Sequence, residues 1–333
     1  MQKPILTLAC ELAPEPLKEL FAAPELINDL KTMNASISLG ILDFSPARVE
    51  VVRQLNKAGI PVTAWLLLPK EQGYWFNRDN SYEAIARYGQ FKTWTAKNKL
   101  RWAGIGLDIE PDMRAIQELM KDRRAGFCRM LKNVVNSRRS QLSLIDYRAL
   151  VAQIRSDGYF VESYQIPFIV DERKAGSTLI QSSFGLVDLQ VDREVLMLYS
   201  SFIPNSGVSF LWSYAPDAQG IGVGSTGGGV DLGEGAMPSL DWHEFKRDLL
   251  LARQKTDSIF IFSLEGCVKQ NFIKDLVNFD WEETVIAPVE TAEKISRFRR
   301  LGRGLLWISA HPWLVFGGLF WLAWFLYPRR RNR

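Results

Sequence analysis

The sequence predicts an α/β protein built as a closed (β/α)8 TIM-type barrel, and three observations support this fold class. Short apolar runs alternate with amphipathic segments over about 280 residues, the pattern of strands joined by crossover helices. Eight such runs occur, which matches the strand number of the barrel. No glycine-rich dinucleotide fingerprint follows the first run, which disfavours an open doubly wound sheet.

The elements follow in order along the chain. The predicted strands are residues 5–9, 37–42, 62–68, 105–109, 159–164, 195–199, 208–214 and 259–264. The predicted amphipathic helices include residues 46–57, 82–97, 113–133, 146–155 and 241–254. Together they place the barrel in residues 1–283.

The repeat is irregular around the sixth and seventh strands. Too few residues separate Tyr199 from Val208 for a crossover helix, because parallel neighbours need a dozen or more. Either one helix is missing there, or the two runs form a hairpin and one strand is misassigned. The glycine-rich run 220–229 lacks the Lys-Ser/Thr ending of a P-loop, so we interpret it as a flexible active-site loop.

The composition is that of a globular protein and excludes one class of partner. Of 333 residues, 47% are hydrophobic and 23% charged. No acid follows Glu293, whereas nine of the 41 basic residues do, so the preceding body is acidic. A nucleic-acid-binding protein needs a basic face on its folded part, and none is predicted. The three cysteines show no metal-ligand spacing and suit a reducing compartment.

The C-terminal region predicts a membrane anchor. Residues 305–327 contain no Asp, Glu, Lys or Arg, are rich in tryptophan and are flanked by arginines, so we expect a single transmembrane helix there, with His311-Pro312 as a potential kink. Residues 284–304 would be a linker and basic juxtamembrane segment, and 328–333 a basic tail. Because no signal peptide is visible, the expected localisation is a single-pass C-terminal anchor with a cytoplasmic body.

The stretch Gly104–Asp112, GIGLDIEPD, supplies the main candidate site. In a strand, Asp108 and Glu110 share one face, while Leu107 and Ile109 share the other. Pro111 ends the ladder directly after Glu110, so both carboxylates should point into the barrel at its carboxyl-terminal mouth. Two acids on an apolar strand are costly unless they are paired or functional.

Such a pair suits acid–base catalysis. Neighbouring carboxylates resist ionising together, so the pKa of one is raised and it stays protonated near neutral pH. Glycoside hydrolysis needs a protonated carboxylic acid for the leaving oxygen and a second group near the sugar. We therefore expect Glu110 to be the general acid and Asp108 to modulate it.

The other predicted strand ends carry polar or aromatic side chains that suit a sugar site. Carboxylates accept hydrogen bonds from hydroxyl groups, and aromatic rings stack on the apolar faces of sugars. Single acids at strand ends also commonly serve as helix caps or ion-pair partners. We predict Tyr199 and Glu265 near the reactive carbon, and Glu11, Asp43, Trp75, Trp212 and Tyr214 as substrate-binding residues.

These residues carry a resemblance to glycoside hydrolases with barrel folds. GIGLDIEPD resembles the fourth-strand Asp-x-Glu motif of chitinase-type enzymes and is also similar to the Asp-x-Glu of barrel-type muramidases, which implies that Glu110 is the proton donor and Asp108 its support. Met197-Leu198-Tyr199 is similar to the Met-x-Tyr of the sixth chitinase strand, where the tyrosine assists an acetamido group. The sequence departs from the chitinase pattern at Ala103, Gly106 and Ser200.

The predicted function is membrane-anchored glycoside hydrolysis of a glycan or glycoconjugate, without a cofactor. One alternative is a non-catalytic barrel that binds a glycan or a protein. Another is a metal-dependent hydrolase that uses Asp43, Asp108, Glu110 and Glu265. We predict no metal site, because His243 is the only histidine in the body and barrel hydrolases usually use imidazole ligands.

Overall fold

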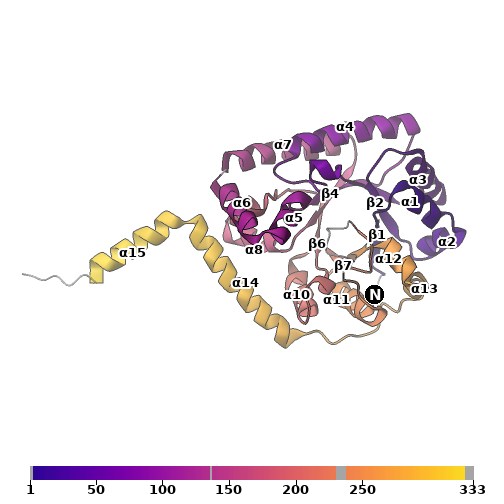
Figure 1. The fold of residues 1–333 in the computed structure, drawn as a ribbon. Coiled ribbons are helices and arrows are strands. Elements are labelled where there is room, and N and C mark those ends of the chain that lie inside the picture. The colour runs from indigo at the N-terminus through magenta and orange to yellow at the C-terminus, as the bar shows by residue number, and fades with distance from the viewer. Residues whose placement is uncertain (1–2, 136, 230–237, 327–333) are drawn as a thin grey trace, which may run out of the picture.

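The computed structural model describes residues 3–135, 137–229 and 238–326, and these form a closed barrel of eight parallel strands (Figure 1). Neighbouring strands pair in chain order, and β8 closes the barrel by pairing with β1. The (β/α)8 prediction is thus confirmed. The strands are β1 (Ile5–Cys10), β2 (Ser36–Ile41), β3 (Val62–Leu66), β4 (Gly104–Ile109), β5 (Phe160–Gln165), β6 (Arg193–Met197), β7 (Gly220–Gly224) and β8 (Ser258–Phe262).

Helices surround the barrel, and local sequence signals define several of their ends. Ser45 caps α3 by accepting a hydrogen bond from the Arg48 amide, and Gly59 ends α3 in the left-handed conformation. Asp241 and Glu244 form a capping box at the start of α11. The barrel helices are α1 (Pro14–Phe21), α2 (Pro24–Thr32), α3 (Pro46–Ala58), α4 (Ser81–Asn98), α5 (Met113–Lys121), α6 (Arg123–Val135), α7 (Ser137–Ser156), α8 (Phe168–Ala175), α9 (Leu179–Phe184), α10 (Gly207–Tyr214), α11 (Trp242–Arg253), α12 (Leu264–Lys269) and α13 (Phe272–Val277).

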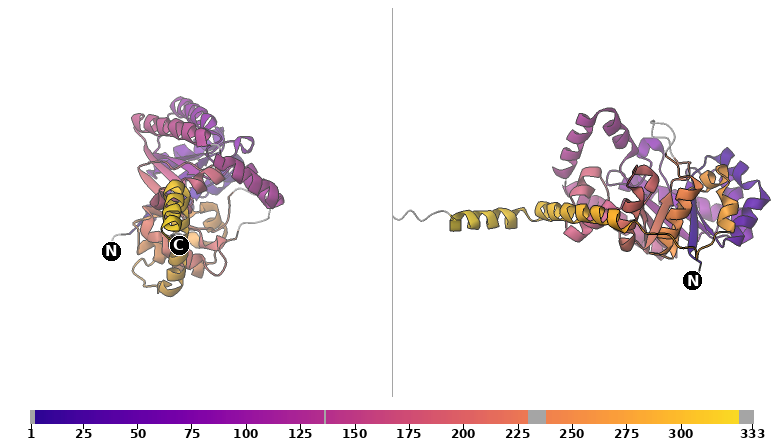
Figure 2. Two further views of the ribbon diagram at one scale, coloured as in Figure 1. Left: turned by 90° about the vertical axis from the view of Figure 1, so that its left-hand side faces the viewer. Right: turned by 90° about the horizontal axis from the view of Figure 1, so that it is seen from below.

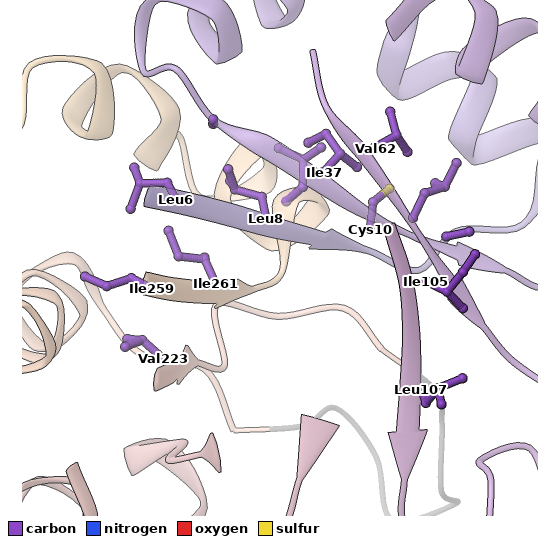
Figure 3. Packing of buried hydrophobic residues seen from close by; sticks show 14 of the residues in the cluster. Leu6, Leu8, Cys10, Ile37, Val62, Ile105, Leu107, Val223, Ile259 and Ile261 are labelled. Carbon is purple, nitrogen blue, oxygen red and sulfur yellow. The ribbon is translucent and has the colours of Figure 1, made fainter. Parts of the chain in front are cut away.

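The core has two layers because side chains alternate along each strand. The outward layer packs between the strands and the helices, as Figure 3 shows for Leu6, Leu8, Ile105, Leu107 and Ile261. The inward layer fills the barrel and is dominated by aromatic rings. Its members include Trp65, Tyr164, Tyr199, Phe260 and Phe262. The barrel interior is therefore a packed core, and functional sites of such barrels lie at the carboxyl ends of the strands.

The irregular region contains two errors of the sequence prediction. Residues 208–214 were expected to be a strand, but they belong to helix α10. The seventh strand is instead β7, which pairs with β6 and β8 and occupies part of the run predicted as a flexible loop. A Cβ on Gly222 would lie 3.2 Å from the Tyr199 ring, so the small residue makes room for that ring inside the barrel.

The C-terminal segment is wrongly predicted as a transmembrane helix. It consists of the end of α14 (Val289–Ala310) and α15 (Pro312–Leu326), which meet at a bend at His311 (Figure 1). Proline lacks an amide hydrogen and clashes with the preceding turn, so a helix stops before it. Across the described ranges, no helix combines the length and apolarity needed to cross a membrane, which overturns the predicted single-pass anchor. Residues 327–333, with the predicted basic tail, lie outside the described residues.

Helix α14 packs against the outside of the barrel, on α8, α9 and α10, and Ser309 near its end still contacts Ser177, whereas α15 extends away from the barrel (Figure 2). Arg299 makes this contact specific. Its guanidinium donates to Asp171 at 2.9 Å and to Asp217 at 2.6 Å, and lies 3.6 Å from the centroid of the Tyr214 ring. Arg299 and Asp171 are both nearly buried, so the pair forms in a largely desolvated contact.

Candidate active site

Strand β4 delivers two carboxyl groups to the carboxyl end of the barrel. Leu107 and Ile109 pack outward, whereas Asp108 and Glu110 line a cavity on the inner side. Asp108 is only 2% exposed and lies level with Tyr164 of β5. Glu110 follows the last residue of the strand. The structure thus places both acids at the mouth of the barrel, as the alternation predicts.

A glycine beneath the two acids allows an aromatic ring to form the floor of the cavity. A Cβ on Gly106 would lie 2.6 Å from the hydroxyl of Tyr164, so only glycine leaves space for this side chain. The Tyr164 hydroxyl shares a hydrogen bond of 2.7 Å with Ser38, and its ring packs on Phe260 with centroids 4.6 Å apart. The packing of Tyr164 therefore explains why glycine stands at position 106, where the chitinase pattern has an acid.

Trp65 holds the deeper acid. Its indole Nε1 donates a hydrogen bond of 3.2 Å to Oδ2 of Asp108, and Oδ1 receives none from an amide or hydroxyl of the described residues. Burial raises the pKa of Asp108 well above its usual value, and the charges of Glu110 and Glu11 add to this. Burial also raises the pKa of Glu110, to about 7. The Asp108–Glu110 pair therefore retains a proton near neutral pH.

The loop after β3 forms one wall of the mouth and is fastened to β4. The amide of Phe76 donates to the carbonyl of Asp108 at 2.9 Å, and the amide of Glu110 donates back to the carbonyl of Phe76 at 3.2 Å. This parallel bridge extends the sheet beyond the end of β3. It places Trp75 in the lining of the cavity, next to the acids.

Glu11 is the third acid of the cavity, at the end of β1. The Tyr74 hydroxyl donates to Oε1 of Glu11, although Tyr74 has a left-handed φ of 68° that is unfavourable for a bulky residue. Burial is the main cause that raises the pKa of Glu11, to about 8, and the charges of Glu265 and Glu110 contribute. Glu11 is therefore mainly protonated at neutral pH.

Glu265 lies behind Glu11 and outside the lining of the cavity. It is in the first turn of α12, and its Oε1 accepts a hydrogen bond of 3.3 Å from the amide of Glu11. Burial raises the pKa of Glu265 to about 7. The Glu265 carboxylate therefore contacts the backbone of Glu11 and does not line the cavity, where the sequence analysis had placed it.

The cavity has a volume of about 370 Å³ and opens between the carboxyl ends of the strands. Three carboxyl groups lie among mostly aromatic and aliphatic side chains, an environment that explains the raised pKa values. Its lining consists of Glu11, Trp65, Trp75, Asp108, Glu110, Ile116, Tyr164, Ile166, Pro167, Phe168, Met197, Tyr199, Phe202, Ile203, Phe210, Phe260 and Phe262.

Tyr199 lies in this lining, just after β6, as the sequence led us to expect. Its ring stacks on Phe262, with centroids 5.7 Å apart. Burial raises the pKa of its hydroxyl strongly, and the charges of Asp108, Glu110 and Glu11 raise it further. The hydroxyl therefore remains a hydrogen-bond donor beside the three acids.

Three residues predicted to bind substrate are absent from the cavity lining. Asp43 pairs with Arg48 at 2.8 Å and accepts from the Ser45 amide, and these bonds lower its pKa despite its partial burial. Trp212 and Tyr214 both belong to α10. The ammonium group of Lys255 lies over the Trp212 ring, and the Tyr214 hydroxyl donates to Asp171. Asp43 is thus an ion-pair partner, the alternative role that the sequence analysis gave to single acids at strand ends. Trp212 and Tyr214 belong to a helix on the outside of the barrel.

The sequence analysis missed several lining residues, and strand phase could have found some of them. Trp65 lies two residues from both Thr63 and Leu67, so the three side chains share one face, and that face points into the barrel. Because Trp65 is only 3% exposed, its burial alone does not distinguish it from an ordinary core residue. Phe260 and Phe262 share the inward phase of β8. Hydrophobicity alone does not separate inward from outward residues in a strand that is buried on both faces.

In the part of the chain that the structure describes, no three His, Cys, Asp or Glu side chains are arranged to hold a metal ion. The three buried carboxyl groups instead interact with one another and with Trp65 and Tyr74. The chemistry that the site offers is proton donation, hydrogen bonding and contact with apolar surface.

Comparison with known proteins supports the fold. No protein-family model matches the chain, and no curated protein sequence matches it. Among solved structures, the PgaB (BpsB) glycoside hydrolase domain from Bordetella bronchiseptica superposes with a TM-score of 0.51 at 10% identity, covering 85% of this chain and 100% of that one. At this identity the likeness shows a shared barrel fold and nothing finer.

Two further structures have lower scores. The 3-keto-D-glucoside 4-epimerase YcjR from E. coli has a TM-score of 0.42 at 12% identity and covers 83% of this chain and 99% of that one. A xylose isomerase-like TIM barrel protein from Mycobacterium smegmatis has a TM-score of 0.44 at 11% identity and covers 83% of this chain and 98% of that one. The resemblance to chitinase-type enzymes and muramidases stays a prediction.

Proposed function

We propose that this protein is a glycoside hydrolase that cleaves its substrate by carboxylate acid–base catalysis. The observation that carries the proposal is the Asp108–Glu110 pair, which lies in an aromatic cavity at the barrel mouth and retains a proton near neutral pH. Because a fold shared at 10% identity is compatible with many activities, the proposal rests on this site and not on the name of the similar domain.

Glu110 is the proposed general acid. Its raised pKa keeps a substantial protonated fraction around pH 7, and its place at the rim gives it access to the oxygen between the sugar and the leaving group. As the C–O bond breaks, the proton of Glu110 passes to that oxygen; a water molecule then attacks the anomeric carbon, its hydroxyl group completes the freed sugar, and its other proton returns to the Glu110 carboxylate. Asp108, held by Trp65, takes part in the shared proton and supports the departure of the Glu110 proton.

The remaining lining residues suit sugar recognition. The rings of Trp65, Trp75 and Phe262 offer apolar surface for a pyranose face. Tyr199 donates a hydrogen bond, and we assign it to a substituent next to the reactive carbon. Glu11 accepts from Tyr74 and has a second oxygen for a sugar hydroxyl. Glu265 acts as a positioning residue, because it holds the backbone of Glu11.

A leaving-group series tests the role of Glu110. Full-length protein and the E110Q variant are assayed on aryl glycosides that share one sugar and differ in the pKa of the phenol. Proton donation matters most for poor leaving groups, so E110Q should lose about 100-fold or more on these and much less on dinitrophenyl glycosides. E25Q, on an exposed position of α2, should behave like the parent.

The outcomes separate the proposal from its rival. An E110Q variant that turns over every substrate like the parent would refute the assignment of the acid. A parent protein that binds glycans but releases no product from any of them would instead support a non-catalytic glycan-binding barrel.

A further inference from the structure

A second cavity adjoins the candidate active site. It has a volume of about 310 Å³ and runs from the barrel mouth along α5 and α6 toward α9. Figure 1 shows α5, α6 and α8 on one side of the barrel, and α6 contacts both α5 and α9. The two cavities share four lining residues, which are Glu110, Ile116, Ile166 and Phe168. Glu110, the proposed acid, thus lies at the junction.

The walls of this second cavity are mainly aliphatic and aromatic. They include Ala115, Leu119, Met130, Ile180, Phe184 and Leu186. Among its described lining residues, only Glu110 and Arg129 are charged, and Arg129 is paired with Glu118 at 2.9 Å. A sugar unit here would bury hydroxyl groups with few partners, which costs free energy for each one left unsatisfied.

We propose that the second cavity holds an apolar aglycone, so that the substrate is a glycoside of a long hydrocarbon alcohol. This inference rests on the proposed function, because a general acid stands beside the leaving-group oxygen and the aglycone must therefore leave the reactive centre on the side of Glu110. The sugar occupies the first cavity, over Trp65 and Asp108. The hydrocarbon chain passes Glu110 and lies between Ala115 and Ile180.

Matched alkyl glycosides test the proposal. Methyl, butyl and octyl glycosides of the same sugars are titrated into the full-length protein by calorimetry, below the concentration at which they form micelles, and their hydrolysis is followed in parallel. Each methylene that enters the cavity should tighten binding about fourfold, so the octyl compound should bind at least about 100-fold better than the methyl one. The gain in kcat/KM should follow the gain in affinity.

Two variants locate the effect. Ala115 lines the second cavity and not the first, so the indole of A115W should occupy the space proposed for the hydrocarbon and abolish the advantage of the octyl over the methyl glycoside. K121W adds the same ring at an exposed position at the end of α5 and should bind like the parent. A chain-length effect that survives in A115W would overturn the placement.

The two proposals fail in different ways. Equal binding and equal hydrolysis of methyl and octyl glycosides would overturn the aglycone site and leave glycoside hydrolysis standing. Tight, A115W-sensitive binding of octyl glycosides with no product would overturn the hydrolytic function and retain the apolar site. If neither compound binds for any sugar tested, both proposals are overturned.

Discussion

The indole nitrogen of Trp65 donates a 3.2 Å hydrogen bond to Asp108, and through it β3 fixes the deeper acid on β4. Both residues are almost fully buried, so this donor is a major polar contact of the Asp108 carboxyl group. A hydrogen bond to a group that gains charge is worth about 1.5–3 kcal/mol, which corresponds to roughly 10- to 100-fold in rate if it forms in the transition state.

The Trp65→Phe variant should therefore lose about 10- to 100-fold in kcat, because the pKa of Asp108 rises further once its donor is removed. Kinetics on a cleaved glycoside measure the effect. Trp102→Phe is the matched control, since Trp102 donates to Thr95 away from the cavity and its loss should lower stability only. Equal kcat values for Trp65→Phe and the parent would contradict a role for this hydrogen bond.

Tyr74→Phe should weaken substrate binding. The Tyr74 hydroxyl partly offsets the effect of burial on Glu11, so its removal should move the pKa of Glu11 above about 8 and free its side chain. We expect KM to rise about tenfold with a smaller change in kcat. Tyr88→Phe removes a similar hydroxyl–carboxylate contact, with Asp157 on the outside of the barrel, and should leave KM unchanged. Similar KM values in the two variants would argue against Glu11 as a ligand of the sugar.

Stability should fall as the pH rises from about 5 to about 9. Burial raises the pKa of Glu11 to about 8 and those of Glu110 and Glu265 to about 7, from 4.5. A raised carboxyl pKa means that the folded state holds its proton more tightly, so the contribution to stability is complete below pH 4.5 and is lost as the pH rises through the folded pKa.

Thermal unfolding across this pH range measures the effect, and each such group changes the slope by at most about 1.4 kcal/mol per pH unit. The Glu11→Gln variant lacks the group with the highest pKa of the three, so its Tm should fall less between pH 7 and 9. A Tm of the parent protein that rises over the same interval would show that these carboxyl groups are ionised in the folded state.

Gly106→Ala should destabilise the barrel and disturb its floor. The added methyl group would lie 2.6 Å from the Tyr164 hydroxyl, in the packed interior between the acids and β5. Overpacking of this kind costs about 1–3 kcal/mol. Gly89→Ala, within α4 and with nothing near its added carbon, should instead gain about 0.5–1 kcal/mol. Chemical denaturation compares the two, and a Gly106→Ala protein as stable as Gly89→Ala would mean that Tyr164 can move away freely.

Arg299→Met should release α14 from the barrel. It removes the cation that Asp171 and Asp217 share, and because Asp217 keeps Lys174 and Asp171 keeps the Tyr214 hydroxyl, we expect a cost of about 1–3 kcal/mol. Limited proteolysis should then cut between α13 and α14 at a higher rate. Arg300→Met removes only an exposed pair with Glu293 and should change neither stability nor cleavage measurably. Equal protection of both variants would show that the other contacts of α14, among them the Ser209–Thr291 and Ser213–Ser296 hydrogen bonds, hold the helix without Arg299.

Regular patterns made most of the barrel predictable from the sequence. Seven of the expected apolar runs overlap strands of the structure, because β-branched and aliphatic runs buried on both faces are distinctive. The exception was β7, whose sequence GIGVG is poor in strand-forming residues and was masked by the more apolar α10, GVSFLWSY. At Gly222 of β7, an added Cβ would lie 3.2 Å from both the Tyr199 ring and the Leu196 carbonyl, a crowding that becomes visible only in three dimensions.

The site was partly predictable for the same reason. Alternation along β4 was enough to bring Asp108 and Glu110 together, and it also placed Glu11 on the inner face of β1. The roles of Trp65 and Tyr74 were not predicted, because each depends on a hydrogen bond to an acid on another strand, Asp108 and Glu11, that no local pattern reveals. The apolar run over 305–327 misled because composition was weighed above the proline that interrupts it.

The backbone bridge between Phe76 and Ile109 fixes the loop after β3 to β4, so we expect this part of the barrel rim to be stiffer than the rest. Trp75 is tied to the same backbone as Glu110, so these two groups keep their separation when a ligand enters. After β5 and β6, the rim instead carries Phe168 and Phe202, which are 47% and 42% exposed. We expect admission and release of ligands to proceed past these two phenylalanines, with the tryptophan side serving as a fixed wall against which the ligand is aligned.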